Sequence, residues 1–205
     1  PSCFQWINEQ ICDEITCPVS FYELNNDCYY QGDLDVLQNI IDVNESLSGE
    51  PLEIGLQFWI YGRLDSLDLD QNQLTSLPES IGNLSSLEEL GLSYNQLTTL
   101  PESIGNLSSL VWLDLKMNQL TTLPESFGNL SSLEYLNLTT NQLTTLPESI
   151  GNLSSLGGLD LNDNQLTTLP ESIVNLSSLG GLVLSHNQLT FIPVSIGDLG
   201  SLEIL

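Results

Sequence analysis

The chain has 205 residues, of which 40% are hydrophobic, enough for one ordinary domain or one solenoid with a cap. It carries 27 Asp plus Glu residues against two basic residues, Arg63 and Lys116, for a formal net charge of -25. This balance argues against nucleic acid and anionic membranes as partners, because both are bound by basic surfaces. Cations, basic proteins and neutral glycans remain possible partners. No apolar run approaches the roughly 20 residues of a membrane helix, and we expect any signal peptide to be absent or already removed.

The first 28 residues contain all four cysteines, Cys3, Cys12, Cys17 and Cys28. An even, clustered set of cysteines in an acidic, polar segment predicts a local disulfide framework and an oxidising compartment. Four cysteines allow three pairings, and the sequence does not choose among them. A zinc site of four thiolates is the alternative, but the gaps of 8, 4 and 10 residues lack the CxxC pairs usual for zinc.

Residues 1–50 are predicted to form a Cys-rich N-terminal cap with one short helix over about 33–43. Asp33 and Asp35 suit the beginning of that helix, where the helix dipole favours negative charge. The helix is expected because four apolar residues recur at helical spacing, namely Leu34, Leu37, Ile40 and Ile41.

Residues 51–63 are predicted to form a degenerate capping repeat that covers the end of the core. Pro51 and Ile54 have the spacing found in the second half of each later repeat. The next repeat-opening leucine, Leu64, follows Ile54 by 10 residues instead of 6. Extra apolar residues fill this gap, namely Phe58, Trp59, Ile60 and Tyr61.

Residues 64–205 contain a 23-residue pattern that occurs six times and begins a seventh time. The pattern is LxxLxLxxNxLxxLPxxIxxLxx, with Phe127 and Ile192 as apolar substitutions. Such a fixed period predicts a solenoid in which each repeat forms one coil. The alternation in LxL predicts a short strand, and stacked strands would form a parallel sheet with a spacing of about 4.8 Å. The second half of each repeat is predicted to be irregular or 3-10 helix, because its GN pair interrupts a longer helix.

This pattern resembles the leucine-rich repeat family, in particular the 23-residue class with an LPxxIGNLxxL second half. The resemblance covers residues 64–205 and, more loosely, 51–63. It implies an α/β solenoid that is curved, with a parallel β-sheet on the concave face and a mostly irregular or 3-10 convex side. It also implies non-enzymatic recognition of a protein or glycan partner. With its Cys-containing N-terminal cap, the chain is similar to secreted bacterial repeat proteins, so we expect an extracellular or cell-surface location.

One asparagine per repeat lies where the predicted strand ends. A buried amide there can bond the backbone of its own turn and of neighbouring coils, and leaving it unpaired would cost about 1–3 kcal/mol. We therefore interpret this Asn ladder as structural: Asn72, Asn95, Asn118, Asn141, Asn164 and Asn187.

Tripeptides of the form NxS/T, which are formal N-glycosylation acceptors, begin at seven asparagines. Two of them, Asn44 and Asn137, lie outside the repeat consensus. The other five are part of the consensus, and we interpret them as structural: Asn83, Asn106, Asn129, Asn152 and Asn175.

The residues beside the strand leucines are expected to face the concave sheet, and the repeat consensus does not determine them. Aromatic side chains and one of the two basic residues gather there in three adjacent repeats. Because Trp and Tyr contribute much of the binding energy at protein interfaces, we predict a binding patch formed by Tyr94, Trp112, Asp114, Lys116, Met117 and Tyr135.

No catalytic arrangement is predicted. His186 is the only histidine, no glycine-rich phosphate loop is present, and the many carboxylates are expected to be solvated. No cofactor is expected. Weak Ca2+ binding by Asp114, Asp160 and Asp163 is the one metal-binding alternative.

Two further functions are possible alternatives. The sequence stops at Leu205 as a strand begins, so either the native chain continues or the open end pairs with another molecule, and head-to-tail stacking on the N-terminal cap would then build a filament. Paired threonines form two ladders of a kind used to bind ice or mineral surfaces, although one threonine of each pair is expected to point into the turn. These pairs are Thr98 and Thr99, Thr121 and Thr122, Thr144 and Thr145, and Thr167 and Thr168.

Overall fold

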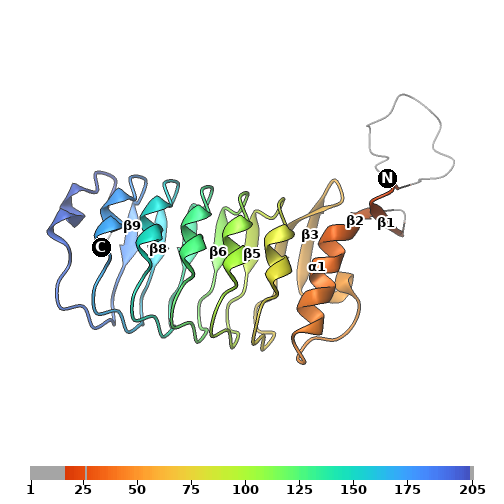
Figure 1. The fold of residues 1–205 in the computed structure, drawn as a ribbon, viewed down its shortest axis with the longest axis horizontal. Helices are drawn as coiled ribbons and strands as arrows, with labels where there is room; N and C mark the ends of the chain where they lie inside the picture. The colour runs from red at the N-terminus through yellow and green to blue at the C-terminus, as the bar shows by residue number, and fades with distance from the viewer. Residues whose placement is uncertain (1–16, 26, 204–205) are drawn as a thin grey trace, which may run out of the picture.

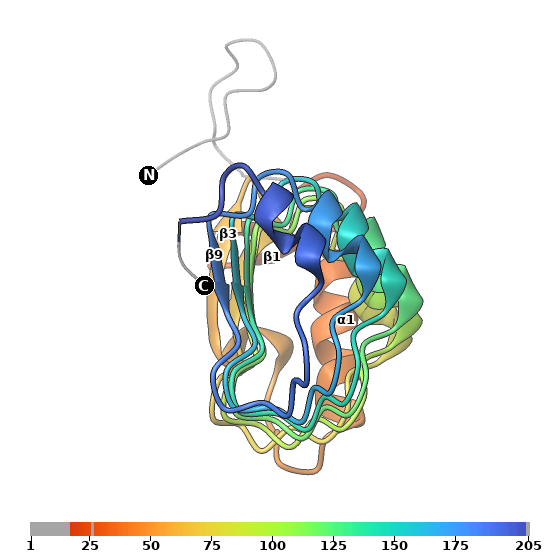
Figure 2. The ribbon, with the colours of Figure 1, turned by 90° about the vertical axis from the view of Figure 1, so that its left-hand side faces the viewer.

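The computed structural model describes residues 17–25 and 27–203, and it shows a single row of stacked coils (Figure 1). Viewed along the row, the strands stack on one side and the short 3-10 helices on the opposite side (Figure 2). The predicted solenoid, with a parallel sheet on one face and a mostly irregular or 3-10 opposite face, is confirmed.

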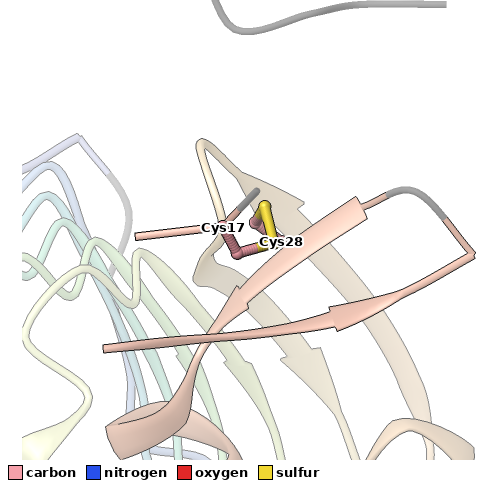
Figure 3. The surroundings of a disulfide bond; sticks show 2 residues. All are labelled: Cys17 and Cys28. Carbon is pink, nitrogen blue, oxygen red and sulfur yellow. A yellow bond between two sulfur atoms is a disulfide. The ribbon is translucent and has the colours of Figure 1, made fainter. Parts of the chain in front are cut away.

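The N-terminal cap begins with an antiparallel hairpin of β1 (Phe21–Leu24) and β2 (Asp27–Tyr30). Cys17 and Cys28 form a disulfide that ties the segment before β1 to β2 (Figure 3). A disulfide in the cap is thereby confirmed, and two of the four thiolates required for a zinc site are used. The other two cysteines lie outside the described residues, namely Cys3 and Cys12.

The cap helix α1 (Gln31–Asp42) lies on the same side as the 3-10 helices and packs beside the first of them (Figure 2). Asp33 lies in its first turn, but the Asp33 carboxylate is buried and bonds outside the helix. It accepts hydrogen bonds from Nε of Arg63 at 2.8 Å and from the backbone N–H of Leu64 at 3.0 Å. The bond to Asp33 raises the pKa of Arg63. Asp33 and Arg63 therefore join the cap to the first coil.

The segment 51–63 departs from the predicted degenerate repeat. It begins like a repeat, with the 3-10 helix η1 (Pro51–Glu53), but β3 (Leu56–Ile60) runs antiparallel to β4 (Arg63–Asp68). A repeat strand would run parallel to β4. The extra apolar residues instead form an edge strand that turns back along the first strand of the solenoid, with Gly62 at a positive φ of 77° in the turn.

The sheet has seven strands in the order β3-β4-β5-β6-β7-β8-β9, and every pair after β3–β4 is parallel. The strands after β4 are β5 (Glu89–Gly91), β6 (Trp112–Asp114), β7 (Tyr135–Asn137), β8 (Gly158–Asp160) and β9 (Gly181–Val183). Each is preceded or followed by a 3-10 helix that begins after a proline. These are η2 (Glu79–Asn83), η3 (Glu102–Asn106), η4 (Glu125–Asn129), η5 (Glu148–Asn152), η6 (Glu171–Asn175) and η7 (Val194–Asp198).

The core lies between the sheet and the 3-10 helices, where the consensus leucines form buried columns. Leu90, Leu113 and Leu136 are directly paired in the register of the sheet and are fully buried. In the last described coil, Ile192 is 38% exposed, whereas Leu169, one period earlier, is 4% exposed. Among the described helices, none is long and apolar enough to cross a membrane.

Candidate binding face

The parallel register aligns the outward-facing side chains of neighbouring strands into columns. Trp112 is paired with Glu89 on one side and with Tyr135 on the other. In the next column, Asp114 lies between Gly91 and Asn137. These columns are those predicted from the repeat alignment, and they bring together the aromatic residues of adjacent coils.

The aromatic rings of Trp112 and Tyr135 stack on the face of the sheet. Their centroids are 6.0 Å apart and their planes differ by 10°. Gly158, which is paired with Tyr135, leaves space for this arrangement, because a Cβ atom there would lie 2.8 Å from Cδ2 of Tyr135. Trp112 is 38% exposed, so the stack presents an aromatic surface to solvent.

The turn after each strand presents a second set of side chains. Tyr94 and Met117 have positive φ values of 56° and 55°, in the left-handed region that L-residues seldom adopt. Both side chains are exposed, Tyr94 at 48% and Met117 at 37%. The ammonium group of Lys116 lies 5.7 Å from the centre of the Tyr94 ring, within the range of a cation–π contact. The structure thus brings the predicted patch together as a Trp–Tyr stack and a Lys–Tyr contact.

One column of acidic residues also has a structural role that the sequence prediction missed. Asp68, Asp114 and Asp160 each accept a hydrogen bond from the backbone N–H two residues later, at 2.8 to 2.9 Å. Asn137 occupies the same column and makes the same bond to Thr139 at 3.0 Å. This is an Asx turn, recognisable in sequence as Asp or Asn two residues before the turn. Since an amide serves as well as a carboxylate, the turn does not require the charge.

The carboxylates on this face act on one another. Burial raises the pKa of Asp114, and the negative charges of Asp70 and Asp68 raise it further. The backbone bond from Lys116 and its positive charge oppose this shift. The pKa of the Tyr135 hydroxyl is also raised, first by burial and then by nearby carboxylates. The face therefore carries a negative potential that Lys116 does not neutralise.

Replacing Asp114 by asparagine is expected to stabilise the protein above the native pKa of Asp114. Because that pKa is raised, the folded chain holds the proton more tightly than the unfolded chain does. Asp114 therefore contributes to stability below the ordinary aspartate pKa, and this contribution is lost as the pH rises through the native pKa. The gain in the Asp114→Asn variant should be at most about 1 kcal/mol, because solvent screens a half-exposed charge. Denaturant unfolding between pH 3 and 7 measures it, and a gain that shrinks with rising pH would contradict the expectation.

The described surface includes the following two hollows. One of about 700 Å3 lies between the β1–β2 hairpin, α1 and η1, away from the sheet. The other, of about 290 Å3, is a hollow at the N-terminal end of the binding face. Its lining includes Phe58, Asp68, Asp70, Glu89, Gly91 and Trp112. Sequence reasoning placed Phe58 in the cap and did not predict that β3 would bring it beside the binding face.

No group of three or more His, Cys, Asp and Glu side chains within residues 17–25 and 27–203 is arranged to hold a metal ion. The Ca2+ alternative at Asp114, Asp160 and Asp163 therefore gains no support from this arrangement. It stays a prediction that calcium titration would test.

The Asn ladder bonds each coil to the one before it. Asn118 accepts a bond from the backbone N–H of Leu97 at 3.0 Å, and its amide donates to the carbonyls of Leu92 at 2.8 Å and Leu115 at 3.1 Å. The same set recurs at later coils. Asn72, at the start of the ladder, differs because its amide donates only to the carbonyl of Asp70. Equivalent bonds are made by Asn95, Asn141, Asn164 and Asn187.

The NxS/T asparagines differ in burial. Asn44, outside the consensus, is buried, and its amide donates to the carbonyls of Ile40 and Ser76. It therefore links α1 to the following coil. The five consensus asparagines have exposed side chains, but each ends a 3-10 helix and its carbonyl accepts the backbone N–H two residues later: Asn83, Asn106, Asn129, Asn152 and Asn175.

The threonine pairs also differ from expectation. Both members of the pairs that begin at Thr98, Thr121 and Thr144 are exposed, and in the last pair Thr167 is exposed and Thr168 partly so. The expectation that one threonine of each pair points into the turn is therefore wrong, because the whole segment lies on the surface between the strand turn and the 3-10 helix. Ice or mineral binding stays a prediction that a thermal hysteresis measurement would test.

The coils share one plan, in which a short parallel strand and a 3-10 helix enclose a leucine core and an asparagine closes the turn. This plan defines a repeat solenoid with an open binding face. The chain belongs to the leucine-rich repeat family, since the family model described as a leucine-rich repeat region matches residues 62–140 and 128–205. The family resemblance drawn from the repeat pattern is therefore confirmed.

Solved structures of this family share the fold. A leucine-rich repeat protein of Leptospira interrogans is 44% identical over 69% of this chain and 36% of its own, with a TM-score of 0.66. The PEPR1–AtPEP1 structure is 31% identical over 86% of this chain and 28% of its own, with a TM-score of 0.77. The ectodomain of the Arabidopsis receptor kinase HAESA, in complex with an IDA peptide hormone, is 27% identical over 85% of this chain and 32% of its own, with a TM-score of 0.71. This chain thus spans about a third of the length of these relatives. No curated protein matches the sequence.

Proposed function

We propose that this protein is an extracellular, non-enzymatic scaffold that binds a protein partner through the concave face of its sheet. The observation that carries the proposal is the exposed stack of Trp112 and Tyr135 on rigid, paired strands. Aromatic side chains held in place by neighbouring strands lose little conformational freedom on binding, which favours affinity. Tyr94, Lys116 and Met117 extend the same patch along the turns after the strands.

The comparisons favour a peptide or protein over other partners. HAESA is solved with a peptide hormone, and PEPR1 is solved with AtPEP1. A binding role agrees with the absence of any catalytic arrangement in the sequence. A glycan is the alternative partner, because exposed aromatic rings also stack on sugars.

The disulfide between Cys17 and Cys28 supports the extracellular location. Disulfides persist in oxidising compartments and are rare in the cytosol. The excess of acidic residues agrees with a surface that must remain soluble at high exposure to solvent.

The double substitution Trp112→Ala and Tyr135→Ala is expected to weaken partner binding by at least about tenfold, which corresponds to about 1.4 kcal/mol. Peptides selected from a phage-displayed random library on the wild-type protein would serve as ligands, with affinities measured by calorimetry. The fold should persist, because both side chains lie outside the leucine core. Unchanged affinity of the double variant would exclude this patch as the binding site.

A matched control removes two exposed aromatic residues elsewhere. Tyr22 on β1 is 49% exposed and Phe191 in the last described coil is 56% exposed. The variant with both replaced by alanine should bind the selected peptides as the wild type does.

Light scattering of the wild-type protein over a range of concentrations tests the head-to-tail filament, which stays a prediction. A mass that grows with concentration would support it.

A further inference from the structure

The hollow at the N-terminal end of the binding face has walls of two kinds. Phe58 on β3 and Trp112 on β6 line it with aromatic rings that are 61% and 38% exposed. Gly91 leaves space beside the carboxylates of Asp68 and Asp70, since a Cβ atom there would lie 3.2 Å from an oxygen of each. The volume of about 290 Å3 is enough for one long side chain of a partner.

The remaining walls are acidic. Asp68, Asp70 and Glu89 line the hollow, and no basic residue does. Within residues 17–25 and 27–203, the only ion pair joins Arg63 to Asp33, and Lys116 lies against Tyr94. The hollow therefore collects carboxylates that form no ion pair with any described residue of this chain.

The hydrogen bonds of these carboxylates come from neutral donors. Asp68 accepts the backbone N–H of Asp70 at 2.8 Å, and Asp70 accepts the backbone N–H and the hydroxyl of Ser93. Glu89 accepts the hydroxyl of Ser66 at 3.4 Å. Such donors hold the carboxylates in place while leaving their charge available to a ligand.

The fold itself does not require a negative charge at position 68. Asn137 closes the equivalent turn three coils later with an amide and makes the same backbone bond. The charge at Asp68 is thus not explained by the turn. A pKa of Asp114 raised in part by Asp70 and Asp68 agrees with an uncompensated negative field at this place.

We propose that the hollow binds an arginine or lysine side chain of a basic segment in the protein partner, with the cation in the space lined by the exposed rings of Phe58 and Trp112 and by the carboxylates of Asp68, Asp70 and Glu89. A desolvated cation over an aromatic face is attracted by the ring quadrupole, and carboxylates add charge-assisted hydrogen bonds. This inference rests on the proposed function, since it takes the concave face as the binding face, and it names the chemistry of the partner.

A basic segment fits this hollow better than a metal ion or a neutral sugar. A metal ion would gain nothing from the exposed rings of Phe58 and Trp112, and these carboxylates are not arranged around one point. A neutral sugar would stack on the rings but would leave three carboxylates without a cation. Only an organic cation uses both kinds of wall.

The test measures the affinity of an acetylated hexaarginine peptide by calorimetry in 0.15 M salt, where charges more than about 8 Å apart are largely screened. The peptide is expected to bind the wild-type protein, and an uncharged hexacitrulline peptide is expected to bind at least about tenfold more weakly. The double variant Asp68→Asn and Glu89→Gln should lose at least about tenfold in affinity for hexaarginine. Phe58→Ala should also lose affinity, which separates the hollow from a purely electrostatic attraction.

A charge-matched control is available on the same face. The double variant Asp160→Asn and Asp163→Asn also removes one turn carboxylate and one exposed carboxylate, but near β8 and away from the hollow. It should bind hexaarginine within about threefold of the wild type. Equal losses in the two double variants would overturn the proposal, because they would show a non-specific attraction by the acidic surface. Equal binding of hexacitrulline would overturn it because the charge would then not matter. Tight binding of spermine or Ca2+ without peptide binding would overturn it because the ligand would then not be a basic segment of a protein.

The two proposals fail in different ways. The variants Phe58→Ala and Asp68→Asn with Glu89→Gln leave Trp112 and Tyr135 themselves unchanged, and these two residues are the ones replaced to test the proposed function. If they leave hexaarginine binding unchanged while the stack variant still loses its selected peptides, the basic-segment inference is wrong and the concave binding face stands. Circular dichroism and thermal melting of every variant confirm that the fold is retained.

Discussion

Replacing Asn118 by alanine is expected to lower the free energy of unfolding by about 2–4 kcal/mol. The substitution leaves the buried N–H of Leu97 without an acceptor and removes one of the bonds to each of the carbonyls of Leu92 and Leu115. Each carbonyl keeps a bond from a neighbouring asparagine, Asn95 or Asn141, so the largest cost is the orphaned N–H. Denaturant unfolding followed by circular dichroism measures the loss.

Asn72→Ala is the matched control for this prediction. Asn72 occupies the same position in its repeat, but it is partly exposed and donates only to the carbonyl of Asp70 two residues earlier. Its loss should cost less than about 1 kcal/mol, because water can replace a single bond at a partly exposed site. Similar losses at the two positions would mean that the bonds between coils add little, and that the ladder is not what holds the coils together.

Gly128→Ala is expected to destabilise the protein by about 2–3 kcal/mol or more, through steric overlap between coils. The backbone of Gly128 lies so close to the next coil that a Cβ atom would collide with the carbonyl oxygen of Ser149. A backbone carbonyl cannot move aside as a flexible side chain can, so η4 and η5 would have to separate. The same clash recurs at Gly82, Gly105 and Gly151. Chemical denaturation measures the effect.

Gly197→Ala provides the control, because Gly197 occupies the same place in η7 but a Cβ atom there would meet nothing within 4 Å. Any gain in helix propensity is shared by both substitutions, so their difference isolates the contact between coils. We expect Gly197→Ala to change stability by less than about 0.5 kcal/mol. A comparable loss at both glycines would show that close approach of the coils is not the reason for glycine here.

Val174 is the one exception to this glycine among η2 to η7. It replaces the glycine of the repeat in η6, and the coil after it is the one that departs from the regular geometry. Pro193, before η7, has φ of -50° and ψ of 130°, whereas Pro170 has -65° and 147°. Leu184 in the last coil is only partly buried, whereas Leu161 is fully buried. A side chain at position 174 thus coincides with a changed backbone conformation before η7.

Much of the binding face follows from the repeat pattern alone. A strand alternates its side chains strictly and the repeat period is constant, so Glu89, Trp112 and Tyr135 had to align once their repeats stacked in register. The contact of Lys116 with the Tyr94 ring was not predicted in detail, although both residues belonged to the predicted patch. It depends on a positive φ at Tyr94, which nothing in the local sequence indicates for a tyrosine.

The hollow could not be predicted, because it joins residues from different parts of the chain. Phe58 lies in a segment whose spacing resembles a repeat, and a parallel strand would have placed its ring elsewhere. Only the antiparallel pairing of β3 with β4 brings Phe58 beside the face that Trp112 occupies. Local spacing does not distinguish these pairings, since both satisfy the same apolar alternation.

The sequence by itself determined the repeat period, the leucine core, the asparagine ladder and the columns of the concave face, since each follows from a pattern that recurs every 23 residues. Only the tertiary structure decided how the repeats join the N-terminal cap. Asp33 bonds to Arg63 and Asn44 bonds to Ser76, so cap and solenoid are joined by contacts across about thirty residues that no periodicity encodes. Repetition makes neighbours predictable because every coil meets a copy of itself. At the cap, each residue meets a different sequence, and the pairing is decided by which buried polar groups find partners.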